Sequence, residues 1–198
     1  SQLKSVLNDF RIDAIKIGMV YDSQTIQVIH SIIKEQKCPI VVDPIIESTT
    51  KATLLKKSAI KYFQKKIIPL ATIITPNKKE AKLLTGISSV KKSAKKLQEL
   101  GATNVIITGS KESNGKIEDF ILESKKEYIL KGEKIKIINH GSGCNYSASI
   151  TASLAMKRSI NDAAVQAKEY VIQSIKNSKK LGKGIRITHK KIPNIQKD

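Results

Sequence analysis

Short runs of β-branched residues alternate along the chain with longer segments in which apolar residues recur every three or four positions. The short runs are apolar throughout, which is typical of strands in a parallel sheet that is covered on both faces. The longer segments have the periodicity of amphipathic helices. The pattern predicts strands at residues 14–18, 39–43, 71–75 and 104–108, and helices starting at Ser23, within 51–66, and at 77–84, 88–101, 143–157 and 160–177.

The alternation of strands with helices predicts the fold class. Strand–helix–strand units require right-handed crossovers, so we expect an α/β fold with a doubly wound, mostly parallel sheet and helices on both faces. Residues 116–138 hold three strand-like runs with no helix between them, which predicts a small antiparallel meander. The basic tail from Lys179 is expected to be irregular. The sequence shows no internal repeat and no change in composition that would mark a domain boundary, so residues 1–198 are expected to form one domain.

Composition narrows the protein class. A chain of 198 residues can bury a substantial core, and aromatic residues make up only 4% of it, so aliphatic side chains must fill that core. The sequence contains no apolar run long enough to cross a bilayer and no secretory signal pattern at its start. Cys38 and Cys144 are too few and too far apart for a disulfide framework, which favours a reducing, cytoplasmic location and no membrane partner.

The net charge of +19 raises the hypothesis of nucleic-acid binding. Nearly all of the excess is lysine, since Arg11, Arg158 and Arg186 are the only arginines. Specific base and phosphate recognition favours the bidentate arginine fork, and few aromatic residues are present to stack on bases. We therefore expect a solvated lysine surface that attracts small anionic substrates, and no specific nucleic-acid partner.

The segment N-H-G-S-G-C-N at residues 139–145 is the strongest candidate for chemistry. It follows the strand-like run 134–138 and opens a helix, and its two glycines would let the backbone approach a ligand. The N-terminus of a helix offers unpaired N–H groups to an anion, and its dipole would lower the pKa of the Cys144 thiol. The alternative is a tight turn at Gly141 and Gly143 beside a small buried cysteine.

Polar residues also follow three of the predicted strands. Ligands of open parallel sheets bind beyond the carboxyl ends of the strands, where Asp43, Asn77, Glu80, Thr108 and Gly109 are expected. In the N-x-x-E pattern, Glu80 could hold Mg²⁺, although a capping box is the commoner explanation of such a pattern. Asp43 could equally be a turn residue before a proline, and the Thr–Gly pair a simple strand end.

Taken together and in order, these motifs resemble the hydroxymethylpyrimidine/phosphomethylpyrimidine kinase family of thiamine biosynthesis, which has a ribokinase-like fold. The likeness runs through nearly the whole chain. The matching segments are K-I-G-M at 16–19, V-V-D-P at 41–44, the I-T-P-N-x-x-E-A pattern at 74–81, N-H-G-S-G-C at 139–144, A-K at 167–168 and G-K-G at 182–184.

The resemblance implies an ATP- and Mg²⁺-dependent kinase that phosphorylates 4-amino-5-hydroxymethyl-2-methylpyrimidine and then its monophosphate. It also implies roles for individual residues. By this resemblance, Cys144 is the catalytic base, and Asp43 shares that role through a water. The phosphate anion hole is formed by Gly141, Ser142 and Gly143, and the metal lies near Asp43 and Glu80. The nucleotide is bound by Asn77, Thr108 and Gly109, and the pyrimidine is contacted by Met19 and Ile45.

The chain departs from the family pattern in three places. The K-G-G after the fourth strand reads T-G-S at 108–110, so a phosphate-binding lysine is missing, and the A-K-S-G loop reads E-S-T-T at 47–50. The family's first strand and its G-G-A-G substrate loop have no counterpart, which predicts an N-terminally incomplete chain. Pyridoxal-type kinase activity and a non-catalytic ligand-binding or regulatory domain remain alternatives. The meander is a candidate contact for a homo-oligomer.

Overall fold

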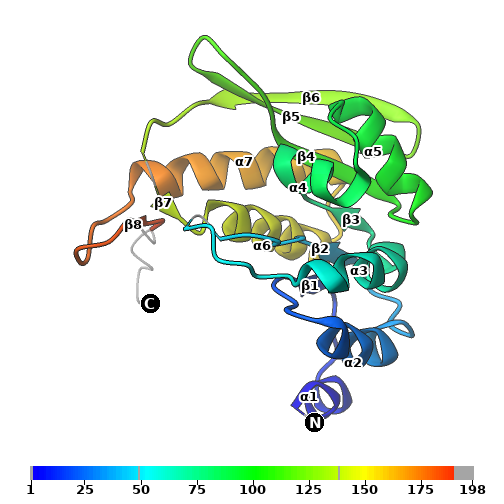
Figure 1. Cartoon of the computed structure of the whole chain (residues 1–198). Helices are drawn as coiled ribbons and strands as arrows, with labels where there is room; N and C mark the ends of the chain where they lie inside the picture. Colours follow the sequence, from blue (N-terminus) through cyan, green and yellow to red (C-terminus); the bar gives the residue numbers. More distant parts are fainter. Residues whose placement is uncertain (1, 49, 138, 190–198) are drawn as a thin grey trace.

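The sheet has six strands that lie side by side in chain order (Figure 1). The computed structural model describes residues 2–48, 50–137 and 139–189. The first four strands are parallel, and β4, β5 and β6 are antiparallel neighbours. The strands are β1 (Ile15–Ile17), β2 (Ile40–Val42), β3 (Ile73–Ile74), β4 (Asn104–Ser113), β5 (Lys116–Glu123) and β6 (Lys126–Glu133). The predicted α/β class, with a mostly parallel sheet and an antiparallel extension, is therefore confirmed.

Helices cover both faces of this sheet (Figure 1). One face carries α2 (Ser23–Ile33), α3 (Ile60–Lys66), α4 (Lys78–Thr85) and α5 (Val90–Glu99). The other carries α6 (Ser142–Ala155) and α7 (Ile160–Lys176). The remaining helical segments are α1 (Gln2–Asp9), η1 (Lys57–Ala59) and η2 (Ile68–Leu70). Within the described ranges, every helix is too short or too polar to cross a bilayer.

The strands separate two hydrophobic cores. Val41 and Ile73 point toward α6 and α7, and their chain neighbours Val42 and Ile74 point toward the opposite layer. Successive side chains of a strand alternate between the two faces of its sheet, and here both faces are apolar because helices cover both. All four side chains have an exposed fraction of 0%, and each stabilises the fold by roughly 1.5–3 kcal/mol on burial. This explains the unbroken apolar runs in the sequence.

Two predicted boundaries were wrong. Asp22, rather than Ser23, caps α2, because its carboxylate accepts the N–H of Thr25 at 3.0 Å. The fourth strand does not end at Gly109 but continues to Ser113. The glycine marks a bulge instead: its φ of +59° is left-handed, and the pairing with β5 shifts between Ile107 and Lys111.

The third run of the predicted meander does not form a strand. The meander consists of β5 and β6 paired with β4, and residues 134–137 connect it to the next element; Ile138 lies outside the described residues. The tail is not wholly irregular, since β8 (Arg186–Ile187) pairs in parallel with β7 (Asn139–His140). The tail therefore lies against the glycine-containing turn at residues 141–143. This contact joins segments that are far apart in the sequence, so local sequence patterns do not predict it.

Candidate active site

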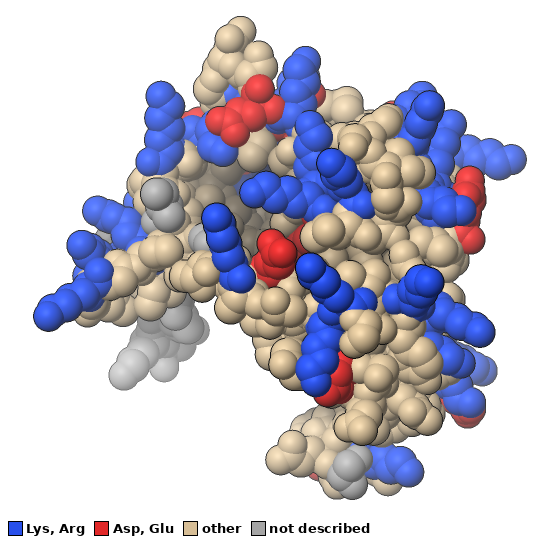
Figure 2. Space-filling model, viewed as in Figure 1, with Lys and Arg blue, Asp and Glu red and all other residues tan. Residues whose placement is uncertain are grey.

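A cavity of about 1220 Å³ opens at the carboxyl ends of the parallel strands. Figure 2 shows a hollow in this face with basic side chains around it. The structure brings every predicted site residue to this one cavity. The predicted residues that line it are Met19, Asp43, Ile45, Asn77, Glu80, Thr108, Gly109, Gly141, Ser142, Gly143 and Cys144.

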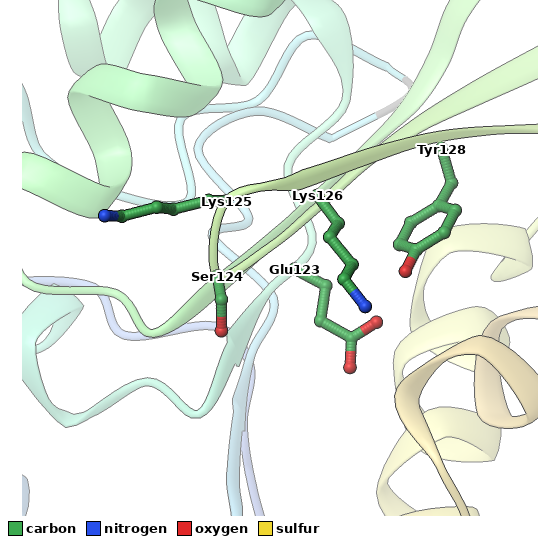
Figure 3. A pocket seen from close by; sticks show the side chains of 5 residues that line it. All are labelled: Glu123, Ser124, Lys125, Lys126 and Tyr128. Atoms are coloured by element: carbon green, nitrogen blue, oxygen red, sulfur yellow. The ribbon is translucent and has the colours of Figure 1, made fainter.

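A second, smaller pocket of about 460 Å³ lies at the turn between β5 and β6. Figure 3 shows its five lining side chains, which come from one hairpin. None of the predicted site residues is among Glu123, Ser124, Lys125, Lys126 and Tyr128. The first cavity is therefore the candidate active site.

The glycine turn leaves the start of α6 open to this cavity. Gly141 caps the helix with a φ of +92°, a left-handed conformation that favours glycine, and no side chain caps the first turn. The N–H groups of the next residues therefore lack an intrahelical acceptor. A Cβ at Gly143 would meet no protein atom within 4 Å, so packing does not require a glycine there. The space in front of the turn suits a phosphate group.

Cys144 stands on this first turn and is exposed. The alternative of a small buried cysteine was therefore wrong. The expected lowering of the thiol pKa is also not found. Partial burial raises the pKa of Cys144, and the negative charge of Asp43 raises it further, while Lys16 opposes the shift. Burial and the nearby carboxylates together outweigh the effect of the helix dipole on this thiol.

Asp43 lies at the end of β2 and is 5% exposed. Its Oδ2 accepts a hydrogen bond of 2.8 Å from the Ser147 hydroxyl. Lys16 places its Nζ 3.3 Å from the same oxygen. A buried carboxylate needs such partners, because an unpaired charge is strongly disfavoured away from water. Asp43 is thus a fixed negative charge beside the Cys144 thiol rather than only a turn residue.

Asn77 and Glu80 form the capping box that the sequence suggested. The Asn77 side chain accepts the N–H of Glu80 at 3.0 Å, and Glu80 Oε2 accepts the N–H of Asn77 at 2.8 Å. The same carboxylate lines the cavity. Burial, and then the charge of Asp43, raise the pKa of Glu80 to about 7. Asp43 and Glu80 both line the cavity and repel each other electrostatically. A divalent cation bound between them would relieve this repulsion.

The donor set fits Mg²⁺ rather than a metal held by protein alone. Among the described residues, no group of three or more His, Cys, Asp or Glu side chains is placed to hold a metal. Mg²⁺ usually binds through one or two carboxylates together with substrate phosphates and waters. Asp43 and Glu80 supply that number of carboxylates, and the open turn of α6 faces the same space.

Thr108 and Gly109 form another wall of the cavity. Thr108 donates its N–H to Pro76 O at 2.9 Å, and Gly109 donates its N–H to Asp119 Oδ1 at 3.0 Å. Asp119 also forms a buried ion pair with Lys168, with Oδ2 and Nζ 2.8 Å apart. Sequence reasoning assigned no role to this pair. The available signals were the position of Asp119 directly before the apolar run 120–122 and the presence of Lys168 in the A-K segment at 167–168.

Met19 and Ile45 occupy the opposite rim. Met19 is 57% exposed, and Ile45 is half-buried on the loop after β2. Five lysines and six carboxylates also line the cavity. The exposed lysines are Lys78, Lys79 and Lys82 on α4, whereas Lys134 and Lys168 form ion pairs with Glu112 and Asp119.

Comparisons with known proteins find relatives along most of the chain. A hydroxymethylpyrimidine/phosphomethylpyrimidine kinase from Aquifex aeolicus is 34% identical over 193 residues, which cover 94% of this chain and 76% of that protein. A pyridoxal kinase from Staphylococcus aureus, solved with pyridoxal, superposes with a TM-score of 0.84 at 30% identity, covering 95% of this chain and 70% of that one. A phosphomethylpyrimidine kinase from Clostridium difficile gives a TM-score of 0.75 at 32% identity, covering 88% and 74%.

The family model described as phosphomethylpyrimidine kinase matches residues 1–189. This range includes every residue of the candidate active site. The chain belongs to the phosphomethylpyrimidine kinase family.

Proposed function

We propose that this protein is a phosphotransferase that transfers the γ-phosphoryl group of ATP to 4-amino-5-hydroxymethyl-2-methylpyrimidine and then to its monophosphate, in thiamine diphosphate biosynthesis. One observation carries the proposal: the three separated sequence motifs that contain Asp43, Glu80 and Cys144 meet at a single cavity. The family membership and the relatives named above support the same activity.

The residues of the chain suit phosphoryl transfer, which depends more on positioning and charge stabilisation than on covalent chemistry. The N–H groups of Ser142, Gly143 and Cys144 would bind the migrating phosphoryl group. Thr108 and Gly109 would contact the nucleotide, with Asn77 beside them. Mg²⁺ at Asp43 and Glu80 would neutralise phosphate charge. The exposed lysines of α4 would attract the anionic nucleotide.

Proton removal from the substrate hydroxyl would involve Cys144 and Asp43 together. The raised pKa keeps the thiol protonated at neutral pH. Cys144 can therefore accept the proton of the substrate hydroxyl only if its own thiol proton moves to another group at the same time. The neighbouring Asp43 carboxylate would accept that thiol proton. A base acting through such a relay accelerates transfer by roughly 10²–10⁴-fold.

Pyridoxal is the second candidate substrate, because the kinase from S. aureus that superposes on this chain was solved with pyridoxal. The same enzyme was also solved with ADP and with AMP-PCP, which supports a nucleotide at the corresponding cavity here. We place the reaction in the cytoplasm, since Cys38 and Cys144 are both free thiols and free thiols persist in a reducing compartment.

The test is a measurement of ADP release with the full chain, ATP and Mg²⁺, and either the hydroxymethylpyrimidine or pyridoxal as acceptor. We expect turnover with the pyrimidine and a lower kcat/KM with pyridoxal. Preference for pyridoxal would replace the substrate assignment. Nucleotide binding without turnover of either acceptor would instead favour a ligand-binding domain of the same fold.

A further inference from the structure

We propose that Asp119 and Lys168 are positioning residues for the nucleotide wall of the cavity: Lys168 holds the Asp119 carboxylate, and Asp119 holds the bulge at Gly109. This inference rests on the proposed function only where it names a nucleotide as the ligand next to Thr108 and Gly109. The structural observation is that Asp119 on β5 and Lys168 on α7 form an ion pair, and that Asp119 also binds the Gly109 N–H.

The bulge creates the need for Asp119. Ile107 lies opposite Phe120 and Lys111 opposite Glu118, so residues 108–110 face Asp119 alone. The ladder between β4 and β5 therefore cannot pair every N–H group of this stretch. Asp119 Oδ1 accepts the Gly109 N–H at 3.0 Å and replaces the missing strand acceptor.

Lys168 makes a carboxylate tolerable at this position. The side chains of Asp119 and Lys168 are only 5% and 8% exposed, and a lone charge at such a depth is strongly disfavoured. The lysine reaches the carboxylate across β6 at Gly132, where a Cβ would overlap Lys168 Cε. A glycine, a buried lysine and a buried aspartate are thus fitted to one another on three neighbouring elements.

Stability alone does not explain this arrangement. Buried ion pairs are often no more stabilising than apolar side chains of the same volume. What an apolar pair could not provide is an acceptor for the Gly109 N–H. The Thr108 N–H donates to Pro76 O at 2.9 Å. Loss of the Asp119 side chain would therefore release Gly109 while Thr108 stayed bound to Pro76.

Two double variants separate the acceptor from the charges. Asp119→Leu with Lys168→Met removes both charges and the acceptor. Asp119→Asn with Lys168→Met removes both charges but keeps an oxygen that can accept the Gly109 N–H. Each variant removes both partners, so neither leaves a buried charge unpaired, which is the main source of destabilisation on breaking such a pair. Lys91→Met with Glu127→Gln neutralises an ion pair on the opposite side of the sheet as the control.

The first measurement needs no ligand. Hydrogen exchange of the Gly109 amide should be about tenfold faster in the leucine variant than in the asparagine variant, because a hydrogen bond has been lost. The second is binding of AMP-PCP, with KM for ATP and kcat where turnover is observed. We expect Kd and KM to be about tenfold higher in the leucine variant than in the asparagine variant, with kcat changed much less.

The outcomes distinguish this inference from the proposed function. Equal Gly109 exchange in the two double variants would overturn the positioning role, whatever the ligand. Slower exchange in the asparagine variant, with no AMP-PCP binding by the wild type, would support the positioning role and overturn the nucleotide assignment of the wall. Equal nucleotide affinity in the two variants, with binding by the wild type, would show that the held bulge does not serve the nucleotide.

Discussion

The hydroxyl of Ser147 donates a hydrogen bond of 2.8 Å to Asp43, a residue 104 positions earlier in the chain. Ser147 is 0% exposed and lies one turn after the glycine-containing start of α6. The bond therefore joins the end of β2 to the helix that carries Cys144. It fixes the carboxylate relative to the thiol, and both groups face the cavity.

Ser147→Ala should reduce kcat by about tenfold and destabilise the fold by roughly 1–3 kcal/mol, because Asp43 loses a buried donor. Turnover and urea unfolding of the same preparation measure the two effects. Ser153→Ala is the matched control, since Ser153 is a buried serine of the same helix that bonds to Gln166 at 2.9 Å, away from the cavity. An equal loss of kcat in both variants would mean that α6 stability, rather than Asp43, sets the rate.

Cys144→Ala should lower kcat by roughly 10²–10⁴-fold, the usual contribution of a general base. AMP-PCP affinity should change little, because the backbone N–H of residue 144 remains. Cys38→Ala removes the other free cysteine of the chain, outside the cavity lining, and should leave turnover at the wild-type level. If Cys144→Ala retains full turnover, the thiol has no part in proton transfer, and Asp43 becomes the sole candidate base.

Glu80 should make the protein less stable as the pH rises from about 4.5 to about 7. Its pKa is 4.5 in the ordinary, unfolded case and about 7 in the folded protein. Between these values the folded state binds the proton and the unfolded state does not, so stability falls with increasing pH and levels off above 7. The change attributable to this group is roughly 1–3 kcal/mol. Unfolding of Glu80→Gln over the same pH range should lack this slope.

Ionisation of Glu80 should also control the affinity for Mg²⁺. Because Mg²⁺ binds the ionised carboxylate, the concentration of Mg²⁺ needed for half-maximal turnover should fall as the pH rises through about 7. Glu80→Gln should need more Mg²⁺ and lose that pH dependence. Glu47→Gln is the control, because Glu47 lines the same cavity but has no proposed metal-binding role. An unchanged Mg²⁺ titration for Glu80→Gln would leave Glu80 with its capping role alone.

The parts of this structure that local chemistry decides could be predicted from the sequence. Residues 39–43 were predicted to form a strand buried on both faces, and β2 lies at Ile40–Val42. Asn77 and Glu80 could be placed at a helix start because capping depends on a spacing of three. Asp43 and Glu80 were also expected to share a site, because the carboxyl ends of parallel strands lie at one edge of the sheet.

The missed features depend on contacts between distant segments. Gly109 was predicted to end the strand, but a glycine can adopt the positive φ of either a strand end or a bulge, and only the pairing with β5 and the contact with Asp119 distinguish the two. The dipole at the start of α6 suggested a lowered thiol pKa, but burial of the thiol, and then the charges of Asp43 and Glu80, raise that pKa in the folded protein. Lys168 and Thr188 likewise acquire their contacts only when the helices and the tail have packed.

Thr188 connects the tail to the phosphate-binding turn. Its hydroxyl accepts a hydrogen bond of 2.8 Å from Asn145 Nδ2 and donates one of 3.1 Å to His140 O. These two residues flank Gly141, where a Cβ would lie 3.1 Å from the same hydroxyl oxygen. The tail thereby fixes both sides of the turn that carries the free N–H groups.

Thr188→Val keeps the shape of the side chain but removes both hydrogen bonds, so the turn should lose its fixed geometry. We expect kcat to fall by about tenfold, because misplaced donors stabilise the transferring phosphoryl group less well, with a loss of roughly 1 kcal/mol in stability. Thr25→Val is the control: its hydroxyl also bonds a side chain, Asp22 at 3.0 Å, but on α2, away from the cavity. Steady-state kinetics of both variants decide the matter, since wild-type kcat in Thr188→Val would show that the turn holds its geometry without the tail.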